Sequence, residues 1–247
     1  MSRLEDNFRK VEPYVPGEQP NLPDMVKLNT NENPYPPSPK VAEALQKFEL
    51  DSLRLYPDPA STDLVNALAE RYYVQADQVY TGVGSDDVLA IAFLTFFNSG
   101  KPILFPDITY SFYDVWAELF QIPYERPALD DAFALRLEDY QCENGGIVIA
   151  NPNAPTGIRQ SEEFLRAVIE ANPNVVVIID EAYADFSGYT ALPLVDEYEN
   201  VVVVQTFSKS RSMAGMRIGH AIGNAKLIKA MNDVRSVSYT HLRAHET

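Results

Sequence analysis

The fold class is decided by the stretch Val201-Val-Val-Val-Gln-Thr-Phe-Ser-Lys209, together with the earlier run Val175-Val-Val-Ile-Ile-Asp-Glu-Ala-Tyr183. Short β-branched runs without polar alternation are typical of strands that are buried on both faces of a parallel sheet. The earlier run leads to Asp180 and the later one to Lys209, so both polar residues are expected at the carboxyl ends of strands. Open α/β sheets bind their ligands at that edge. We therefore predict an α/β fold with a ligand site beside Asp180 and Lys209.

The segment that follows, residues 205–219, surrounds Lys209 with hydroxyls and small residues and ends near Arg217. A lysine amine, a carboxylate and an anion site made of hydroxyls and an arginine are the groups that pyridoxal 5'-phosphate chemistry requires. The lysine would bind the cofactor covalently, Asp180 would keep its ring nitrogen protonated, and Ser208 with Arg217 would hold its phosphate. The alternative interpretation is a surface lysine beside a strand, with Asp180 as a helix cap.

From residue 79 to residue 222, apolar runs of strand length alternate with segments of helical periodicity. This alternation predicts a mostly parallel sheet with helices on both faces. Strands are expected to begin at residue 79 and to lie at 101–105, 146–150, 175–179, 201–204 and 217–222. Helices are expected at 39–48, 63–73, 161–170 and 226–235, with one more that ends at about residue 97 and one that passes through 116–120. His220 lies in the last apolar run and is expected as a strand residue, not as a catalytic base.

The chain has 247 residues, of which 46% are hydrophobic, and a formal net charge of -15. Such a chain can bury one large core, and its negative charge argues against nucleic-acid or anionic-membrane surfaces, which are bound by clustered lysine and arginine. A single cysteine, Cys142, excludes an internal disulfide and a cysteine-rich metal site, so no metal is expected. The first residues lack the apolar core of a signal peptide. We expect a cytoplasmic protein.

Several short motifs follow one another in a fixed order. They are Leu28-Asn-Thr-Asn-Glu-Asn-Pro34, Tyr56-Pro-Asp58, Gly84-Ser-Asp86, Asn151-Pro-Asn-Ala-Pro-Thr-Gly157 and Ser208-Lys209. With Asp180 and Arg217, this set resembles the fold-type I, class I/II aminotransferases from about residue 14 to about residue 235. The resemblance implies the large domain of a fold-type I pyridoxal-phosphate-dependent transferase, with the family's small C-terminal domain missing from this chain.

The resemblance also implies a reaction. These enzymes use pyridoxal 5'-phosphate to move an amino group between a small-molecule amino donor and a 2-oxo acid, and they act as homodimers. The most similar branch acts on histidinol phosphate and 2-oxoglutarate in histidine biosynthesis. Within the class, the alternatives are an aromatic or broad-specificity aminotransferase and a threonine-phosphate decarboxylase. From another class, the alternative is an inactive fragment that binds pyridoxal phosphate.

The resemblance assigns roles around the lysine. Lys209, Asp180 and Tyr183 are the expected catalytic residues, because they match the cofactor-binding lysine, the partner of the ring nitrogen and the partner of the ring oxygen. The residues expected to contact the cofactor as well are Gly84, Ser85 and Asp86 through their amides, Thr206, Ser208 and Arg217 at the phosphate, and Tyr110 stacked on the ring. Asn31, Glu32 and Asn33 are expected to line the substrate site. Tyr56 is expected to reach the cofactor phosphate of the partner subunit.

One position departs from the family pattern. The family has an asparagine before Pro-Thr-Gly that hydrogen-bonds the ring oxygen, whereas this chain has Ala154. The role is left to Asn153, to Tyr183 alone or to water.

Three regions are expected along the chain. Residues 1–38 are rich in proline and predict an extended N-terminal arm. Residues 39–235 would form the pyridoxal-phosphate-binding large domain, incomplete at its C-terminus. Residues 236–247 show no apolar periodicity and do not resemble the family, so we interpret them as a non-native tail. The alternative is a natural divergent tail.

Overall fold

The computed structural model describes residues 8, 9, 18 and 25–235. The strands are β1 (Val79–Val83), β2 (Ile103–Leu104), β3 (Tyr124–Glu125), β4 (Gly146–Ala150), β5 (Val177–Asp180), β6 (Val201–Thr206) and β7 (Ile218–Gly223). The α-helices are α1 (Pro39–Gln46), α2 (Thr62–Tyr72), α3 (Ser85–Phe96), α4 (Phe112–Phe120), α5 (Glu162–Ala171), α6 (Ala184–Ser187), α7 (Leu194–Glu197) and α8 (Ala225–Val234). Short 3-10 helices are η2 (Leu50–Arg54), η3 (Ala76–Gln78), η4 (Leu137–Tyr140) and η5 (Ala214–Met216).

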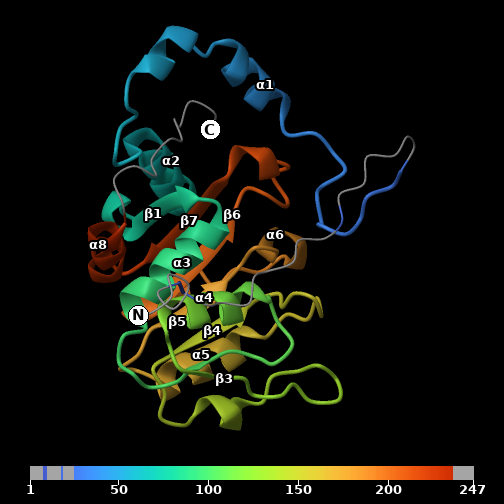
Figure 1. Ribbon diagram of the computed structural model, residues 1–247, viewed down its shortest axis with the longest axis vertical. Coiled ribbons are helices and arrows are strands. Elements are labelled where there is room, and N and C mark those ends of the chain that lie inside the picture. Colours follow the sequence, from blue (N-terminus) through green and yellow to red (C-terminus); the bar gives the residue numbers. More distant parts are fainter. Residues whose placement is uncertain (1–7, 10–17, 19–24, 236–247) are drawn as a thin grey trace, which may run out of the picture.

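The strands form one sheet in the order β1-β7-β6-β5-β4-β2-β3 (Figure 1). Strand β7 runs antiparallel to both of its neighbours, and the other ladders are parallel. The predicted α/β fold with a mostly parallel sheet is confirmed. No helix in the described part of the chain is long and apolar enough to cross a membrane.

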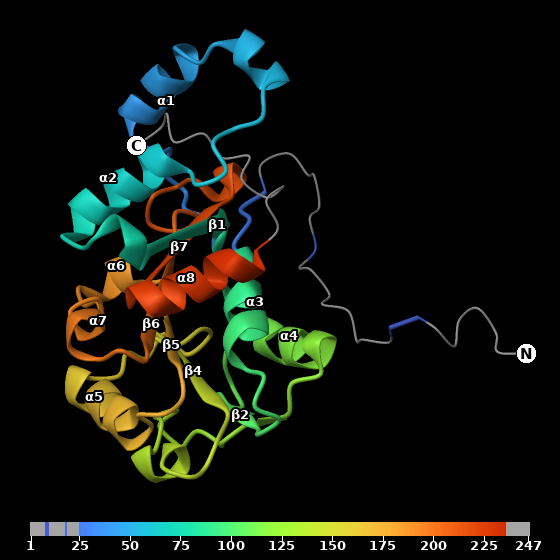
Figure 2. The same cartoon turned by 90° about the vertical axis from the view of Figure 1, so that its left-hand side faces the viewer.

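Alternate residues of the central strands enter two separate cores. Val201 and Val203 of β6 pack with helices α2, α5 and α7, whereas Val202 and Val204 pack with α3, α4 and α8. Figure 2 shows this arrangement nearly edge-on, with α5 and α7 on one side of the sheet and α3 and α4 on the other. Because both faces are covered, every residue of β6 is buried. This explains why its sequence is a continuous apolar run rather than an alternating one.

The reversed direction of β7 matters for the site. Parallel strands β4, β5 and β6 place their carboxyl ends at one edge of the sheet, and an antiparallel neighbour places its first residue there. The register pairs Asp180 with Val204 and Thr206 with Gly219. Arg217, which directly precedes β7, therefore lies at the same edge as Asp180 and Thr206.

Some boundaries differ from the sequence-based prediction. Strand β2 has two residues, although residues 101–105 were predicted, and β3, α6 and α7 were not predicted at all. These elements are too short to show a periodicity. Residues 25–38 contain no helix or strand, in keeping with an extended arm, while most of the rest of the arm and the whole predicted tail, 236–247, lie outside the described residues. Helix α1 and η2 stand away from the sheet (Figure 1).

A close backbone contact joins β7 to the loop before α3. A Cβ atom at Gly219 would overlap the Gly84 carbonyl carbon and the Ser85 nitrogen, and both of these are backbone atoms that cannot swing away. Gly219 therefore allows the β1–α3 loop to lie directly against β7. This contact fixes the start of α3 beside Arg217.

The contact at Gly219 can be tested by substitution. Gly219→Ala should lower the free energy of unfolding by about 1–3 kcal/mol, because the added methyl group forces the two backbone segments apart. Gly215→Ala is the matched control, since a Cβ atom there would meet nothing within 4 Å. Urea unfolding of both variants measures the difference. Equal stabilities of the two variants would contradict the close approach.

Candidate active site

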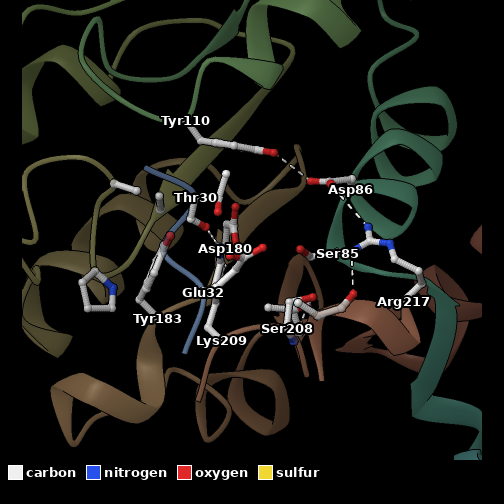
Figure 3. Close-up of a pocket in the computed structure, with 16 residues that line it drawn as sticks. Thr30, Glu32, Ser85, Asp86, Tyr110, Asp180, Tyr183, Ser208, Lys209 and Arg217 are labelled. Carbon is white, nitrogen blue, oxygen red and sulfur yellow. Dashed lines mark hydrogen bonds and ion pairs between the residues drawn. The ribbon is translucent and has the colours of Figure 1, made fainter. Parts of the chain in front are cut away.

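A cavity of about 250 Å³ opens at the edge of the sheet where β4, β5 and β6 end. Its volume is near the lower end of the range of ligand pockets, roughly 300 Å³ and above. Of the residues predicted for the site, the cavity is lined by Glu32, Ser85, Asp86, Tyr110, Asp180, Tyr183, Thr206, Ser208, Lys209 and Arg217. Figure 3 shows that Lys209 and Tyr183 lie at one end of this group and Ser85 and Arg217 at the other.

Lys209 lies three residues beyond the end of β6, and its amine is held at one end of the cavity. The Nζ atom donates a hydrogen bond to the Thr30 carbonyl oxygen at 3.1 Å. It also lies 5.5 Å from the centroid of the Tyr183 ring. The arm thus reaches the lysine directly, because Thr30 also lines the cavity.

Asp180 is the last residue of β5, and its side chain is buried. Its Oδ2 atom accepts a hydrogen bond from the Tyr113 hydroxyl at 2.6 Å, and its Oδ1 atom accepts one from the Ala182 amide at 3.1 Å. Burial raises the pKa of Asp180 to about 6, and these two hydrogen bonds oppose the rise. A carboxylate placed in this way is a strong acceptor for a cationic N–H group inside the cavity.

The opposite end of the cavity offers several donors to an anion. Helix α3 begins there with Gly84 as its N-cap, and no side chain among the described residues caps its first amides. The hydroxyls of Thr206 and Ser208 lie 3.0 Å apart and both line the cavity. Arg217 adds a guanidinium group. Amides at the start of a helix, hydroxyls and an arginine together form an anion site.

The anion site holds its arginine in place with an acidic neighbour. The Arg217 guanidinium lies 3.5 Å from Asp86 Oδ2, and the Tyr110 hydroxyl donates to Asp86 Oδ1 at 2.9 Å. A Cβ atom at Gly84, whose φ is 85°, would overlap the Arg217 guanidinium. Glycine at this position therefore permits both the positive φ angle and the overlying arginine.

Five predicted residues lie outside the cavity lining, and one of them, Gly84, is the N-cap of α3 directly before Ser85. Asn153 donates to the Ile108 carbonyl oxygen and the Thr156 hydroxyl and accepts from Thr109, so its amide ties the loop together. Tyr56 has an exposed fraction of 94% and does not approach the cavity. The other two, Asn31 and Asn33, contact site residues from outside.

Asn31 and Asn33 hold the site through hydrogen bonds. The Asn31 amide donates to the Tyr183 hydroxyl at 3.0 Å. The Asn33 amide donates to the Lys209 and Ser210 carbonyl oxygens at 3.1 and 3.3 Å. The Asn-Glu-Asn segment thus fixes Tyr183 and the lysine loop, while Glu32 alone of the three lines the cavity.

Sequence reasoning missed Thr30 and Tyr113. Thr30 acts through its backbone carbonyl, which no side-chain pattern can indicate. Tyr113 follows Tyr110 at helical spacing, and a buried tyrosine normally needs a partner for its hydroxyl. That need was the available signal. The partner, Asp180, lies 67 residues later in the chain, so only the fold identifies it.

A second buried carboxylate, Glu181, supports the site from behind. It accepts hydrogen bonds from the Thr190 hydroxyl at 2.6 Å and from the Gln205 amide at 2.8 Å. Gln205 in turn accepts from the Tyr72 hydroxyl at 2.7 Å, and Tyr72 accepts from Arg211 at 2.6 Å. This chain of hydrogen bonds links the end of β5 to the lysine loop. Burial raises the pKa of Glu181 to about 7.

His220 is buried in β7, as predicted for a strand residue. Its ring stacks on Tyr72 with centroids 5.4 Å apart. Burial lowers the pKa of His220 to about 3, so the ring is neutral near pH 7.

The raised pKa of Glu181 predicts a pH-dependent stability. The folded pKa lies above the unfolded value of 4.5, so between about pH 4.5 and pH 7 the folded state binds more protons and stability falls as pH rises. Glu181→Gln lacks this titration. The free energy of unfolding of the wild type minus that of the variant should decrease by roughly 1–3 kcal/mol across this window, measured by urea unfolding. A constant difference would contradict the buried titration.

Comparison with known proteins agrees with this geometry. The profile of the family described as "Aminotransferase class I and II" matches residues 23–245. A histidinol-phosphate aminotransferase of Lactococcus lactis subsp. cremoris is 51% identical over 94% of this chain, and the chain spans 65% of the length of that relative. A histidinol-phosphate aminotransferase of Pseudomonas putida is 53% identical over 96% of this chain and is covered to 68%.

The fold agrees as well. The structure of histidinol-phosphate aminotransferase from Sinorhizobium meliloti, in complex with pyridoxal-5'-phosphate, aligns with a TM-score of 0.79 and 24% identity. The alignment covers 87% of this chain and 60% of that one, and at this identity it supports the fold alone. Because the family profile matches residues 23–245 and the relative from Pseudomonas putida is 53% identical over 96% of this chain, the chain belongs to the class I and II aminotransferase family.

Proposed function

We propose that the whole protein is a pyridoxal-phosphate-dependent aminotransferase that exchanges an amino group between histidinol phosphate and 2-oxoglutarate. One observation carries the proposal: a single cavity is lined by the Lys209 amine, the buried Asp180 carboxylate and an anion site. The choice of substrate is supported by relatives named for histidinol phosphate that are 51–53% identical to this chain. Because the chain spans 65% of the length of the first of these, the activity is proposed for the whole protein.

The residues of the cavity fit pyridoxal phosphate. A phosphate group suits the anion site of Ser85, Ser208 and Arg217, and a protonated ring nitrogen suits Asp180. The Tyr110 side chain supplies a flat apolar surface for a ring. When bound, the cofactor supplies an electron-withdrawing ring that stabilises negative charge on the carbon that loses its proton.

The side chains of the chain perform the remaining tasks. The Lys209 amine would hold the cofactor and, when free, would move a proton as general base and acid. The Tyr183 hydroxyl accepts from Asn31, so its own proton is free to be donated to a ring oxygen. We assign the ring-oxygen contact to Tyr183, because the Asn153 amide hydrogens are already used and residue 154 is alanine.

Glu32 provides the substrate side of the cavity with a negative charge. Its carboxylate lies 2.9 Å from the Lys27 amine, and that hydrogen bond lowers the pKa of Glu32. An ionised carboxylate in the lining suits the cationic groups of an amino donor. We propose Glu32 as a substrate contact, with Asn31 and Asn33 as residues that hold the site around it.

A homodimer is part of the proposal. Apolar side chains are exposed along residues 26–56, where Val26, Leu28, Leu50 and Leu53 each have an exposed fraction of 69% or more. Apolar patches of this kind mark interaction sites, and most assemblies of identical chains are two-fold symmetric. In such a dimer, Tyr56 would meet the cofactor phosphate of the partner subunit. The single described cysteine, Cys142, is free, in keeping with the proposed cytoplasmic location.

The lysine assignment has a direct chemical test. Pyridoxal phosphate should be fixed to the protein by borohydride reduction, and mass spectrometry should locate the added mass on the peptide that contains Lys209. Lys209→Ala should lose both the added mass and transamination, because no other amine lines the cavity among the described residues. Lys226→Ala changes an exposed lysine of α8 and should keep both.

Rates with histidinol phosphate, phenylalanine and threonine phosphate then separate the substrate classes. Fastest transamination of histidinol phosphate supports the proposal, and retained transamination in Lys209→Ala would overturn it.

The contribution of Tyr56 from the partner subunit can be tested by mixing. Tyr56→Phe and Lys209→Ala should each weaken the site, whereas their hybrid dimer contains one site with both native residues. Mixing the two variants after dissociation should therefore restore up to a quarter of wild-type turnover, because half of the dimers are hybrids and one of their two sites is intact. Absence of any recovery would show that Tyr56 does not act between subunits.

A further inference from the structure

We propose that Tyr113 is a positioning residue for Asp180: its buried hydroxyl holds one carboxylate oxygen and keeps the carboxylate a pure hydrogen-bond acceptor toward the cavity. This inference rests on the proposed function and deepens it. Tyr113 does not line the cavity and acts only through Asp180.

The geometry leaves the tyrosine no other polar role. Tyr113 has an exposed fraction of 0%, and its ring packs against Phe93, Phe105 and Trp116 in the core between the sheet and helices α3 and α4. Its hydroxyl donates to Asp180 Oδ2 at 2.6 Å. A hydroxyl that donates to a carboxylate at this distance forms a charge-assisted hydrogen bond.

The direction of the hydrogen bond is fixed by chemistry. Burial raises the pKa of Tyr113 well above its ordinary value, and the neighbouring Asp180 adds to this effect. The phenol is therefore protonated near neutral pH and donates to Asp180. A donor stabilises the ionised form of a carboxyl group and lowers its affinity for a proton.

This effect matters for a cation held by Asp180. A proton between Asp180 and a protonated ring nitrogen stays on the nitrogen only if the carboxylate has the lower proton affinity. Burial works against this condition, and so does the negative charge of Asp86 across the cavity. The Tyr113 hydroxyl and the Ala182 amide, one on each oxygen, oppose both effects. Tyr113 is the only one of these two donors that a substitution can remove.

The charged groups around Asp180 determine how the test is designed. Asp86 from α3, Glu181 from the same strand end, and Lys209 and Arg217 across the cavity all lie near it. Glu181 titrates in an overlapping pH range. It is unchanged in the wild type and in both tyrosine variants, so differences between their pH curves do not come from its removal. Tyr140→Phe is the matched control: Tyr140 also has an exposed fraction of 0%, lies in the other core, and has a hydroxyl without a partner in the described chain.

The first measurement is urea unfolding of the cofactor-free protein between pH 5 and pH 9. Asp180 has a folded pKa of about 6, above its unfolded value of 3.8, so its ionisation lowers stability as pH rises to about 6, and the end of this decrease lies inside the measured range. Tyr113→Phe should raise the pH at which this decrease in stability ends by about one unit, because the carboxylate loses a donor that stabilises its ionised form. Incorporation of 3-fluorotyrosine at position 113, a stronger donor of the same shape, should move it downward. Tyr140→Phe should follow the wild-type curve.

The second measurement uses the intact protein loaded with pyridoxal phosphate. Tyr113→Phe should lower kcat about tenfold, while the dissociation constant of pyridoxal phosphate and KM change by less than about threefold. In the Asp180→Asn background, where no carboxylate remains, Tyr113→Phe should cause no further loss.

The outcomes separate the two ideas. If the pH curves of Tyr113→Phe and Tyr140→Phe coincide, or if Tyr113→Phe lowers kcat equally in the Asp180→Asn background, the positioning role is wrong. If the wild type does not bind pyridoxal phosphate, the proposed function fails, whereas the comparison of pH curves still tests the link between Tyr113 and Asp180.

Discussion

The hydrogen-bond register among β5, β6 and β7 is the constraint on which the site depends. It places Asp180 beside Val204 and Thr206 beside Gly219, so the ends of β5 and β6 and the start of β7 meet at one edge of the sheet. A shift of one residue in either ladder would turn every side chain of the strand to the other face. Both faces are covered by helices, and the two apolar cores therefore lock the register that sets the positions of Asp180, Lys209 and Arg217.

Hydrogen bonds from outside the cavity then fix the side chains within that frame. Tyr113 holds Asp180 from the core between the sheet and α4, and Asn33 holds the backbone at Lys209 from the arm. The chain of Glu181, Gln205, Tyr72 and Arg211 braces the same loop from the other face. Catalytic groups need such supporting contacts, because a lysine on a long flexible stem would otherwise lose its geometry.

The sequence predicted what local patterns control. The run of four valines ending at Val204 indicated a doubly buried strand, and the structure places Lys209, Asp180 and Arg217, which the motifs singled out, in the lining of one cavity. The reversed direction of β7 was not predictable, because the residue pattern of a run such as 217–222 is the same for a parallel and an antiparallel strand. Asn153 was considered for the cavity because of its neighbours in sequence, yet its amide is bound by Thr109 and Thr156 in the folded loop. Tyr113 required knowledge of a contact with a residue 67 positions away.

The acidic residues at the site reveal a balance between stability and function. Burial of Asp180 raises its pKa from 3.8 to about 6, which corresponds to a destabilisation of about 3 kcal/mol near pH 7. Stability of a typical domain is only about 5–15 kcal/mol, so this cost is considerable. The burial is useful to the cavity, because a desolvated carboxylate attracts a cation far more strongly than a hydrated carboxylate does. A ligand with a cationic nitrogen facing Asp180 and an anionic group facing Arg217 would offset this destabilisation. Such a ligand binds the folded protein and not the unfolded chain, so it would stabilise the fold. The same burial that weakens the empty protein therefore makes the cavity selective for a ligand with these two opposite charges.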